Sequence, residues 1–194
     1  MSRPLTIGLT GGIAAGKSTA LAAFERLGAA TISSDAVVHE LLDSEPMLSR
    51  IAERWGEDVA PEGRVDRARV GEIVFADPEQ LSWLESQVHP LVGERIGGFL
   101  ASLPETTEIA VVEVPLLFES GMEGVFDTSV AVVTSDEMRR SRAEARGHAL
   151  VGERDARQLD QAEKAARADH VVENDGTPEQ LEQALSALVE KLRG

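Results

Sequence analysis

A glycine-rich motif near the start of the chain constrains the fold more than any other feature. The pattern G-x-x-x-x-G-K-[ST] runs from Gly11 to Ser18. Residues 5–10 before it are β-prone, and the apolar positions of residues 20–27 after it recur with helical spacing and end at Gly28. A strand, a glycine-rich loop and a helix in this order direct backbone N–H groups and a helix N-terminus toward a phosphate group. The motif therefore predicts a P-loop in an α/β fold.

The residue types inside the motif indicate a nucleoside triphosphate site. In such a loop Lys17 reaches the β- and γ-phosphates, and the Ser18 hydroxyl holds Mg²⁺. The alternative is a glycine-rich turn with a solvated lysine, but a chance match is rare in a chain with only three lysines. The GTPase patterns D-x-x-G and N-K-x-D are absent from the sequence, which disfavours a GTPase.

Composition excludes several classes of protein. The chain has 194 residues, of which 42% are hydrophobic, and a net charge of −15. This length suits one globular domain with a small insertion. The acidic surface repels nucleic acids and anionic membranes, so we expect neither as a partner. The absence of cysteine excludes disulfides and thiolate metal sites. Because no long apolar segment is present, we expect a cytoplasmic protein.

Four further segments have the pattern of strands that alternate with helices: residues 30–33, 109–114, 129–133 and 170–173. Their apolar runs do not alternate with polar residues, which is typical of strands buried on both faces of a parallel sheet. A final helix is expected after Thr177, with Pro178 in its first turn. Together these segments predict a doubly wound α/β fold that binds ligands at the carboxyl ends of its strands.

Residues 35–105 are too many for one β-α-β crossover. Their pattern is helical, with breaks expected at Pro46, near residues 61–63, at Pro78 and at Pro90. We therefore expect an inserted helical subdomain over residues 35–105. The core of the domain then comprises residues 1–34 and 106–194.

Two carboxylates follow predicted strands and are candidates for phosphoryl-transfer chemistry. Asp35 comes just after the strand 30–33, where it can accept the proton of an acceptor hydroxyl as a general base. Asp also suits the cap of the next helix, and position alone does not decide between the two roles. Glu113 lies at the end of the strand 109–114, where it can orient Mg²⁺ or its water shell. The alternative for Glu113 is an ordinary charge at a strand end.

Arginines are concentrated between residues 139 and 157, where six of them occur: Arg139, Arg140, Arg142, Arg146, Arg154 and Arg157. Guanidinium groups suit phosphate oxygens and the charge that develops in a transition state. Arg142 and Arg146 are four positions apart and share a helix face. The segment is either a solvated helix balanced by its acidic neighbours or a lid that excludes water during transfer.

The order of these motifs resembles the dephospho-coenzyme A kinase family over nearly the whole chain. The resemblance is carried by the P-loop, Asp35, F-A-D-P at 75–78, H-P-L at 89–91, V-P-L-L-F-E at 114–119, the arginines at 142 and 146, A-D at 168–169 and N-D-G at 174–176. Unrelated nucleotide-binding proteins share the P-loop. The pair formed by H-P-L and V-P-L-L-F-E is far more specific.

The resemblance implies the last step of coenzyme A biosynthesis, in which ATP phosphorylates the ribose 3′-hydroxyl of dephospho-CoA. It implies a P-loop core like that of nucleoside monophosphate kinases, with helices on both faces of the sheet. It further implies a CoA-binding subdomain over residues 35–105 and a helical lid over residues 136–165. ATP and Mg²⁺ would be the cofactors, and the partners would be small molecules. The alternative is another small-metabolite or nucleoside monophosphate kinase, and the oligomeric state stays open.

The resemblance also implies roles for individual residues. Asp35 would be the base, with Lys17 and Arg142 as the other catalytic groups. ATP would be bound by Gly11, Gly12, Ile13, Ala14, Ala15, Gly16, Lys17, Ser18, Thr19, Arg146 and Asn174, the last of these near the adenine. The acceptor would contact Thr10, Asp35, His89, Leu116, Leu117 and Phe118. Mg²⁺ would be held by Ser18, and Glu113 is added as a second candidate ligand from its position at the end of a strand. The lid of the family contains a glutamine. Because the lid of this chain is shorter than the family pattern, that glutamine corresponds either to Gln158 or to Gln161.

Overall fold

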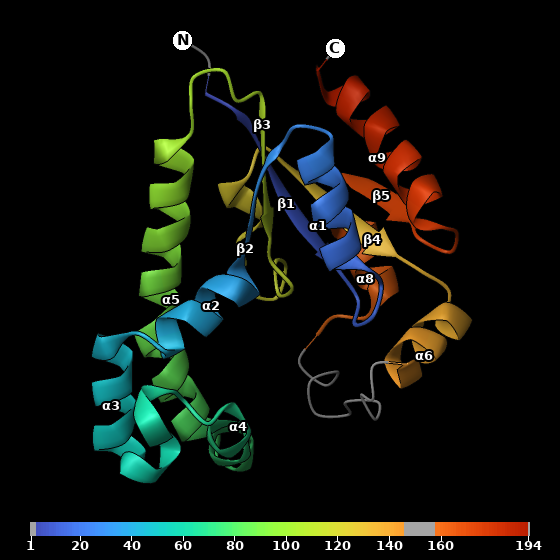
Figure 1. Cartoon of the computed structure of the whole chain (residues 1–194). Helices are drawn as coiled ribbons and strands as arrows, with labels where there is room; N and C mark the ends of the chain where they lie inside the picture. The colour runs from blue at the N-terminus through green and yellow to red at the C-terminus, as the bar shows by residue number, and fades with distance from the viewer. Residues whose placement is uncertain (1–2, 146–157, 194) are drawn as a thin grey trace. The chain divides into compact units, whose positions relative to one another are not determined.

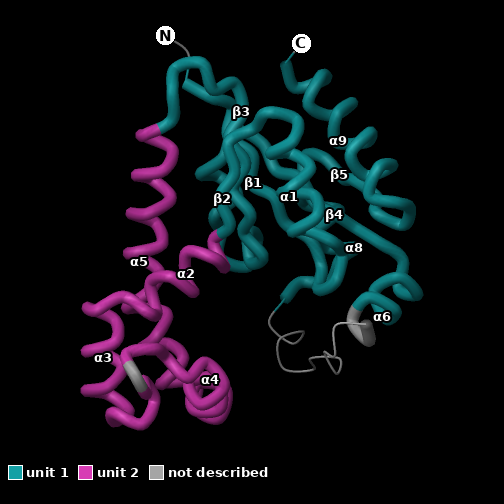
Figure 2. The backbone as a smooth tube through the Cα atoms, in the orientation of Figure 1, with its two compact units in different colours: residues 1–33, 103–194 teal, residues 34–102 magenta. Residues whose placement is uncertain are grey.

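The chain forms two compact units in the computed structural model, which describes residues 3–145 and 158–193 (Figure 1). Unit 1 comprises residues 1–33 and 103–194, and unit 2 comprises residues 34–102 (Figure 2). The expected subdomain, 35–105, differs from unit 2 by one residue at its start and three at its end. That this unit binds CoA stays a prediction.

Unit 1 is built on a parallel sheet of five strands in the order β2-β3-β1-β4-β5. The strands are β1 Leu5–Gly11, β2 Ala30–Ser33, β3 Ile109–Glu113, β4 Thr128–Val133 and β5 His170–Glu173. Each agrees with its predicted range to within one residue, and the predicted parallel sheet is confirmed. Because β1 is central, the P-loop leaves the middle of the edge formed by the carboxyl ends of the strands.

Helices cover both faces of this sheet. Among its described residues, unit 1 has the helices α1 Lys17–Arg26, α6 Asp136–Ala145, α8 Gln161–Arg167 and α9 Pro178–Arg193, together with the short turn η3 Glu123–Val125. α1 and α9 lie side by side on one face, where Phe24 and Leu185 are fully buried against Ile7 and Leu9 of β1 (Figure 1). α8 contacts β1 and β4. On that side, a Cβ on Gly8 would meet the side chains of Leu117 and Phe126, so the sheet is covered there as well.

Local sequence signals explain where two of these helices begin and end. α1 stops because Gly28 takes a left-handed backbone (φ 89°), and its N–H donates to the Glu25 carbonyl. α9 begins with a reciprocal cap, in which the N–H of Thr177 donates to Gln180 Oε1 and the N–H of Gln180 donates to Thr177 Oγ1. The expected start of the last helix is therefore confirmed.

Unit 2 is helical. Its elements are α2 Ser34–Leu42, α3 Glu45–Trp55, η1 Glu57–Val59, η2 Pro61–Gly63, α4 Arg67–Ala76 and α5 Pro78–Ser102. Its core is centred on Met47, Ile51 and Val59, which are almost completely buried. No helix among the described residues is long and apolar enough to cross a membrane.

The predicted break at Pro90 is wrong, because α5 continues through it. Proline lacks an N–H, so the carbonyl one turn earlier loses its helical partner. α2 and α4 both pack along α5, and Val88 and Ile96 on either side of Pro90 are buried. This packing outweighs the missing hydrogen bond. The other expected breaks coincide with helix starts or with η2.

Candidate active site

The P-loop runs from the end of β1 to the start of α1 as a tight turn. Ala14 and Gly16 have positive φ angles of 60° and 99°, and the N–H of Ala15 donates to the Gly12 carbonyl at 3.2 Å. Glycine adopts this backbone freely, whereas the Cβ of Ala14 makes it strained. The turn directs N–H groups and the N-terminus of α1 toward one point, which suits an anion of phosphate size.

Lys17 folds back over the loop that precedes it. Its Nζ donates to the carbonyls of Gly11 and Gly12 at 3.0 and 3.1 Å. Ser18 is exposed beside it, and Thr19 is half-buried. The ammonium group and the Ser18 hydroxyl therefore flank the same turn, as their predicted roles toward phosphate and Mg²⁺ require.

Asn174 and Arg142 both donate hydrogen bonds to the P-loop at Ala15. Asn174 follows β5 and is buried, and its Nδ2 donates to the Ala15 carbonyl at 2.8 Å. Arg142 on α6 donates from Nη2 to the Asn174 carbonyl at 2.9 Å and from Nη1 to the Ala15 carbonyl at 3.5 Å. Asn174 was predicted to bind nucleotide and Arg142 to be a catalytic group; both lie at the P-loop, and both roles stay predictions. The Asn174 side-chain amide stabilises the shape of the loop through its hydrogen bond to the Ala15 carbonyl. Its expected place near the adenine stays a prediction.

The loops that follow β4 and β5 are joined by hydrogen bonds next to Asn174 and Arg142. Hydrogen bonds from Thr134 Oγ1 and from the Ser135 N–H, both 2.6 Å, hold the pKa of Asp175 below its ordinary value, and the charge of Arg142 adds to the effect. Gln161 on α8 clamps the same turn, because its Oε1 accepts from the Thr134 N–H and its Nε2 donates to the Thr134 carbonyl. Both polar atoms of the Gln161 side-chain amide are therefore already hydrogen-bonded to the backbone of Thr134.

A pocket of about 350 Å³ lies beside the P-loop. Its lining residues are Gly12, Ile13, Arg139, Gln158, Leu159, Asp160 and Gln161. The Oε1 atom of Gln158 is buried and accepts no hydrogen bond from the residues that the structure describes. Of the two candidate lid glutamines, Gln161 has its carboxamide oxygen bonded to Thr134, whereas that of Gln158 has no partner among residues 3–145 and 158–193.

Glu113 occupies the end of β3 and is only 7% exposed. Its backbone pairs in register with Leu9 of β1 and Ser33 of β2. Asp35 follows Ser33 by two positions and is exposed in the first turn of α2. A buried carboxylate thus lies on the same sheet edge as the start of the P-loop, and its role toward Mg²⁺ stays a prediction.

The residues expected to contact the acceptor differ in exposure. Thr10 is fully buried and donates from Oγ1 to the Pro115 carbonyl at 3.1 Å. Leu117 and Phe118 are also buried, and the Phe118 ring meets the Arg167 guanidinium with 4.8 Å between Cζ and the ring centroid. Leu116 is 38% exposed, so it is the residue of the segment 116–118 with a side chain open to a ligand.

The remaining predicted site residues belong to other parts of the chain. Asp35 and His89 are exposed on α2 and α5 of unit 2, while the P-loop belongs to unit 1. Arg146 lies outside the described residues. The sequence reasoning missed Lys164, which is fully buried on α8 and reaches the Pro115 carbonyl and Glu119. The available signals were the scarcity of lysine and the glutamate that ends V-P-L-L-F-E.

Comparison with known proteins decides the family. The family model of dephospho-CoA kinase matches residues 5–180. The chain belongs to the dephospho-CoA kinase family. A dephospho-CoA kinase of Thermobifida fusca is 38% identical over 97% of this chain and 96% of its own length. One from Anaeromyxobacter dehalogenans is 40% identical over 97% of this chain and 92% of its own length.

Solved structures agree with this placement in the dephospho-CoA kinase family. A Thermus thermophilus protein has a TM-score of 0.83 and 36% identity, with both chains covered completely. The dephospho-CoA kinase from Campylobacter jejuni has a TM-score of 0.69 and 25% identity, again over both whole chains. A shikimate kinase from Acinetobacter baumannii, 15% identical with a TM-score of 0.53 over 97% of this chain and 94% of its own, shares the fold alone. The predicted P-loop kinase fold is confirmed, and the chain is a kinase.

Proposed function

We propose that this chain transfers the γ-phosphoryl group of ATP to the ribose 3′-hydroxyl of dephospho-CoA, giving CoA and ADP. The observation that carries the proposal is the match to the dephospho-CoA kinase family over residues 5–180. In the transfer, the bond between the γ-phosphorus and the β,γ-bridging oxygen breaks, a bond to the 3′-oxygen forms, and the hydroxyl proton is released. The protein must therefore hold the donor and the acceptor in line and neutralise spreading negative charge.

The donor half of the proposed site is the P-loop. The N–H groups of the turn and the N-terminus of α1 would hold the phosphates. Lys17 would leave the carbonyls of Gly11 and Gly12 and move its ammonium group onto the β- and γ-oxygens. Arg142 already contacts the loop at Ala15, so its guanidinium group would add positive charge where the transition state gathers negative charge. Gln158 would line the donor pocket with its carboxamide oxygen, which accepts no hydrogen bond from the described part of the chain.

The acceptor half would be assembled around Asp35. Its exposed carboxylate would take the proton of the 3′-hydroxyl, while His89 and Leu116 would contact the rest of the acceptor. Ser18 and Glu113 would supply a hydroxyl and a carboxylate oxygen, which are ligand types that Mg²⁺ takes together with phosphate and water oxygens. The residues present therefore fit the ion. When bound, Mg²⁺ would neutralise charge on the phosphate oxygens.

An acceptor panel tests the proposed reaction. ADP release is measured with ATP and dephospho-CoA, with each nucleoside monophosphate and with shikimate, and the product is identified by mass spectrometry. We expect turnover with dephospho-CoA and a product heavier by one phosphoryl group at the ribose. Faster turnover with any nucleoside monophosphate would overturn the proposal.

Two variants with matched controls test the catalytic assignments. Lys17→Ala should lower kcat by at least about 100-fold, because it removes the cation from the phosphates, whereas Lys191→Ala at an exposed position of α9 should not. Asp35→Asn should lower kcat by about 100- to 10,000-fold, the range of general acid–base catalysis, whereas Glu40→Gln on the same helix should not. Near-wild-type turnover of Asp35→Asn would remove the base assignment while leaving the overall reaction intact.

A further inference from the structure

Lys164 is buried completely although it carries an ammonium group. Its Nζ donates to the Pro115 carbonyl at 2.5 Å and forms an ion pair with Glu119 Oε1 at 2.9 Å. Charges taken out of water lose hydration, and the ion pair that results is often no better for stability than an apolar pair of the same size. A buried lysine in this setting is therefore better explained by the geometry that it imposes.

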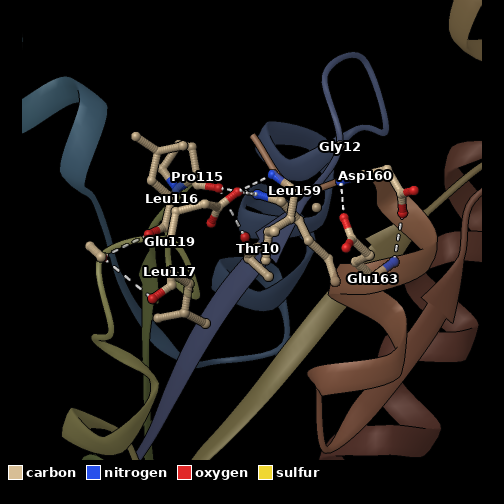
Figure 3. A network of polar contacts seen from close by, with 12 residues as sticks. Thr10, Gly12, Pro115, Leu116, Leu117, Glu119, Leu159, Asp160 and Glu163 are labelled. Carbon is tan, nitrogen blue, oxygen red and sulfur yellow. Dashed lines mark hydrogen bonds and ion pairs between the residues drawn. The ribbon is translucent and has the colours of Figure 1, made fainter. Parts of the chain in front are cut away.

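The partners of Lys164 join three segments that are distant in the sequence. The Pro115 carbonyl also accepts from Thr10 Oγ1 at 3.1 Å, and Thr10 directly precedes the P-loop. Glu119 Oε1 accepts from the Leu159 N–H at 2.8 Å, which brings in the chain just before α8. In Figure 3, Thr10, Pro115, Glu119 and Leu159 converge between β1 and the segment that follows β3. Lys164 contributes the positive charge at this convergence.

The Glu119 carboxylate is held in its poorly solvated place by its ion pair with Lys164. The Glu119 side chain is 14% exposed, and its second oxygen, Oε2, is buried without a hydrogen bond from the described residues. Removing the ammonium group alone would leave a poorly solvated carboxylate, which would move toward water and take the segment 115–119 with it. Thr10 would then lose the fixed position of its acceptor carbonyl.

We infer that Lys164 is a positioning residue for the phosphoryl transfer proposed above, acting through Pro115 and Glu119 without touching substrate. The inference rests on the proposed function. Lys164 fixes the segment 115–119 relative to α8 and to the strand that enters the P-loop. Leu116 of this segment is exposed and could contact a ligand. Without it, donor and acceptor are still bound, but their reacting atoms are no longer held in line.

The test compares three variants with the wild-type enzyme. Lys164→Met keeps the length of the side chain and removes its charge, and Glu119→Gln keeps an oxygen that can accept from Leu159. The double variant Lys164→Met/Glu119→Gln leaves no buried charge unpaired, so it is expected to fold even where Lys164→Met alone does not. Lys191→Met on the exposed part of α9 is the matched control.

We expect the double variant to bind ATP within about twofold of wild type and to lose about tenfold or more in kcat/KM for dephospho-CoA, because small misplacements of reacting groups have effects of this size. Amide hydrogen exchange at residues 115–119 should quicken in the same variant, and Lys191→Met should change neither property. A double variant with wild-type kcat/KM would overturn the inference. So would an equal loss of ATP affinity, or a double variant that does not fold, since either result marks the pair as structural only. A wild-type enzyme that is inactive with dephospho-CoA would instead refute the proposed function.

Discussion

The contact between Gly16 and Asn174 allows the shape of the P-loop to be tested quantitatively. A Cβ placed on Gly16 would lie 2.1 Å from Asn174 Nδ2, and Gly16 has a φ of 99°. The same Nδ2 donates to the Ala15 carbonyl, and Asn174 is 5% exposed. The substitution Gly16→Ala must therefore both strain the backbone and displace a buried amide.

The magnitude follows from these two terms. A left-handed backbone at a residue with a Cβ costs about 1–2 kcal/mol. Displacing the Asn174 amide takes its buried Nδ2 donor away from the Ala15 carbonyl, which keeps only the longer contact from Arg142, at about 1–3 kcal/mol. We expect Gly16→Ala to lower the free energy of unfolding by roughly 2–5 kcal/mol. In an Asn174→Ala background the amide is already gone, so the same substitution should cost only the backbone term of about 1–2 kcal/mol. The double variant is then more stable than additivity predicts by the amide term, about 1–3 kcal/mol.

The assay is urea unfolding of the four proteins of this cycle, followed by far-UV circular dichroism. Tryptophan fluorescence is less suitable, because Trp55 and Trp83 both lie in unit 2 and report on that unit. Gly28→Ala is the matched control, since Gly28 has a φ of 89° but a Cβ there meets nothing within 4 Å. It should cost the backbone term alone. Additive single and double variants, or equal losses at Gly16 and Gly28, would refute the reasoning.

Two further predictions concern stability elsewhere. Hydrogen bonds from Arg3, with further ones from Thr6, lower the pKa of Asp127 to about 2. Because the folded-state pKa lies below the unfolded one, the carboxylate adds about 1–2 kcal/mol of stability above pH 4, and this contribution is lost as the pH falls toward 2. Asp127→Asn should therefore reduce the change in the free energy of unfolding between about pH 4 and pH 2. If urea unfolding shows the same pH dependence in the variant as in the wild type, the prediction is contradicted. Gly97→Ala should raise the free energy of unfolding by about 0.5–1 kcal/mol, because a Cβ at this exposed helical position meets nothing within 4 Å; a loss measured in the same assay would contradict this.

Elements with a strong local signal could be predicted from the sequence. The apolar runs at residues 109–114 and 129–133 correspond to β3 and β4, and the P-loop pattern lies where a strand meets a helix. The order of the strands has no local signal, because it depends on which apolar faces meet across long loops. The pairing of Leu9 with Glu113 on one side and Val130 on the other is of this kind.

Predictions failed or remained coarse where tertiary contacts decide. Pro90 has the strongest local signal for a helix break, yet packing of α2 and α4 carries α5 through it. Asn174 was predicted to bind nucleotide, and this stays a prediction; the contact of its amide with the Ala15 carbonyl, 159 positions earlier in the chain, had no signal in the sequence. Lys164 is part of no local pattern, because its acceptors lie on a segment 45–49 residues away. Buried polar contacts of this kind become visible only with the fold.

These contacts also explain how an acidic chain can build an anion site. The net charge is −15, so a phosphate must be attracted locally, against the field of the whole molecule. In the P-loop, the carbonyls of Gly11 and Gly12 are bound by Lys17, and the Ala15 carbonyl is bound by Asn174 and Arg142. With these oxygens occupied by donors inside the protein, the negative ends of the loop dipoles are neutralised and the N–H ends remain for the ligand. In the proposed donor site both cations would thus favour phosphate binding even without contacting a phosphate, so their loss should affect the loop itself as well as the reaction.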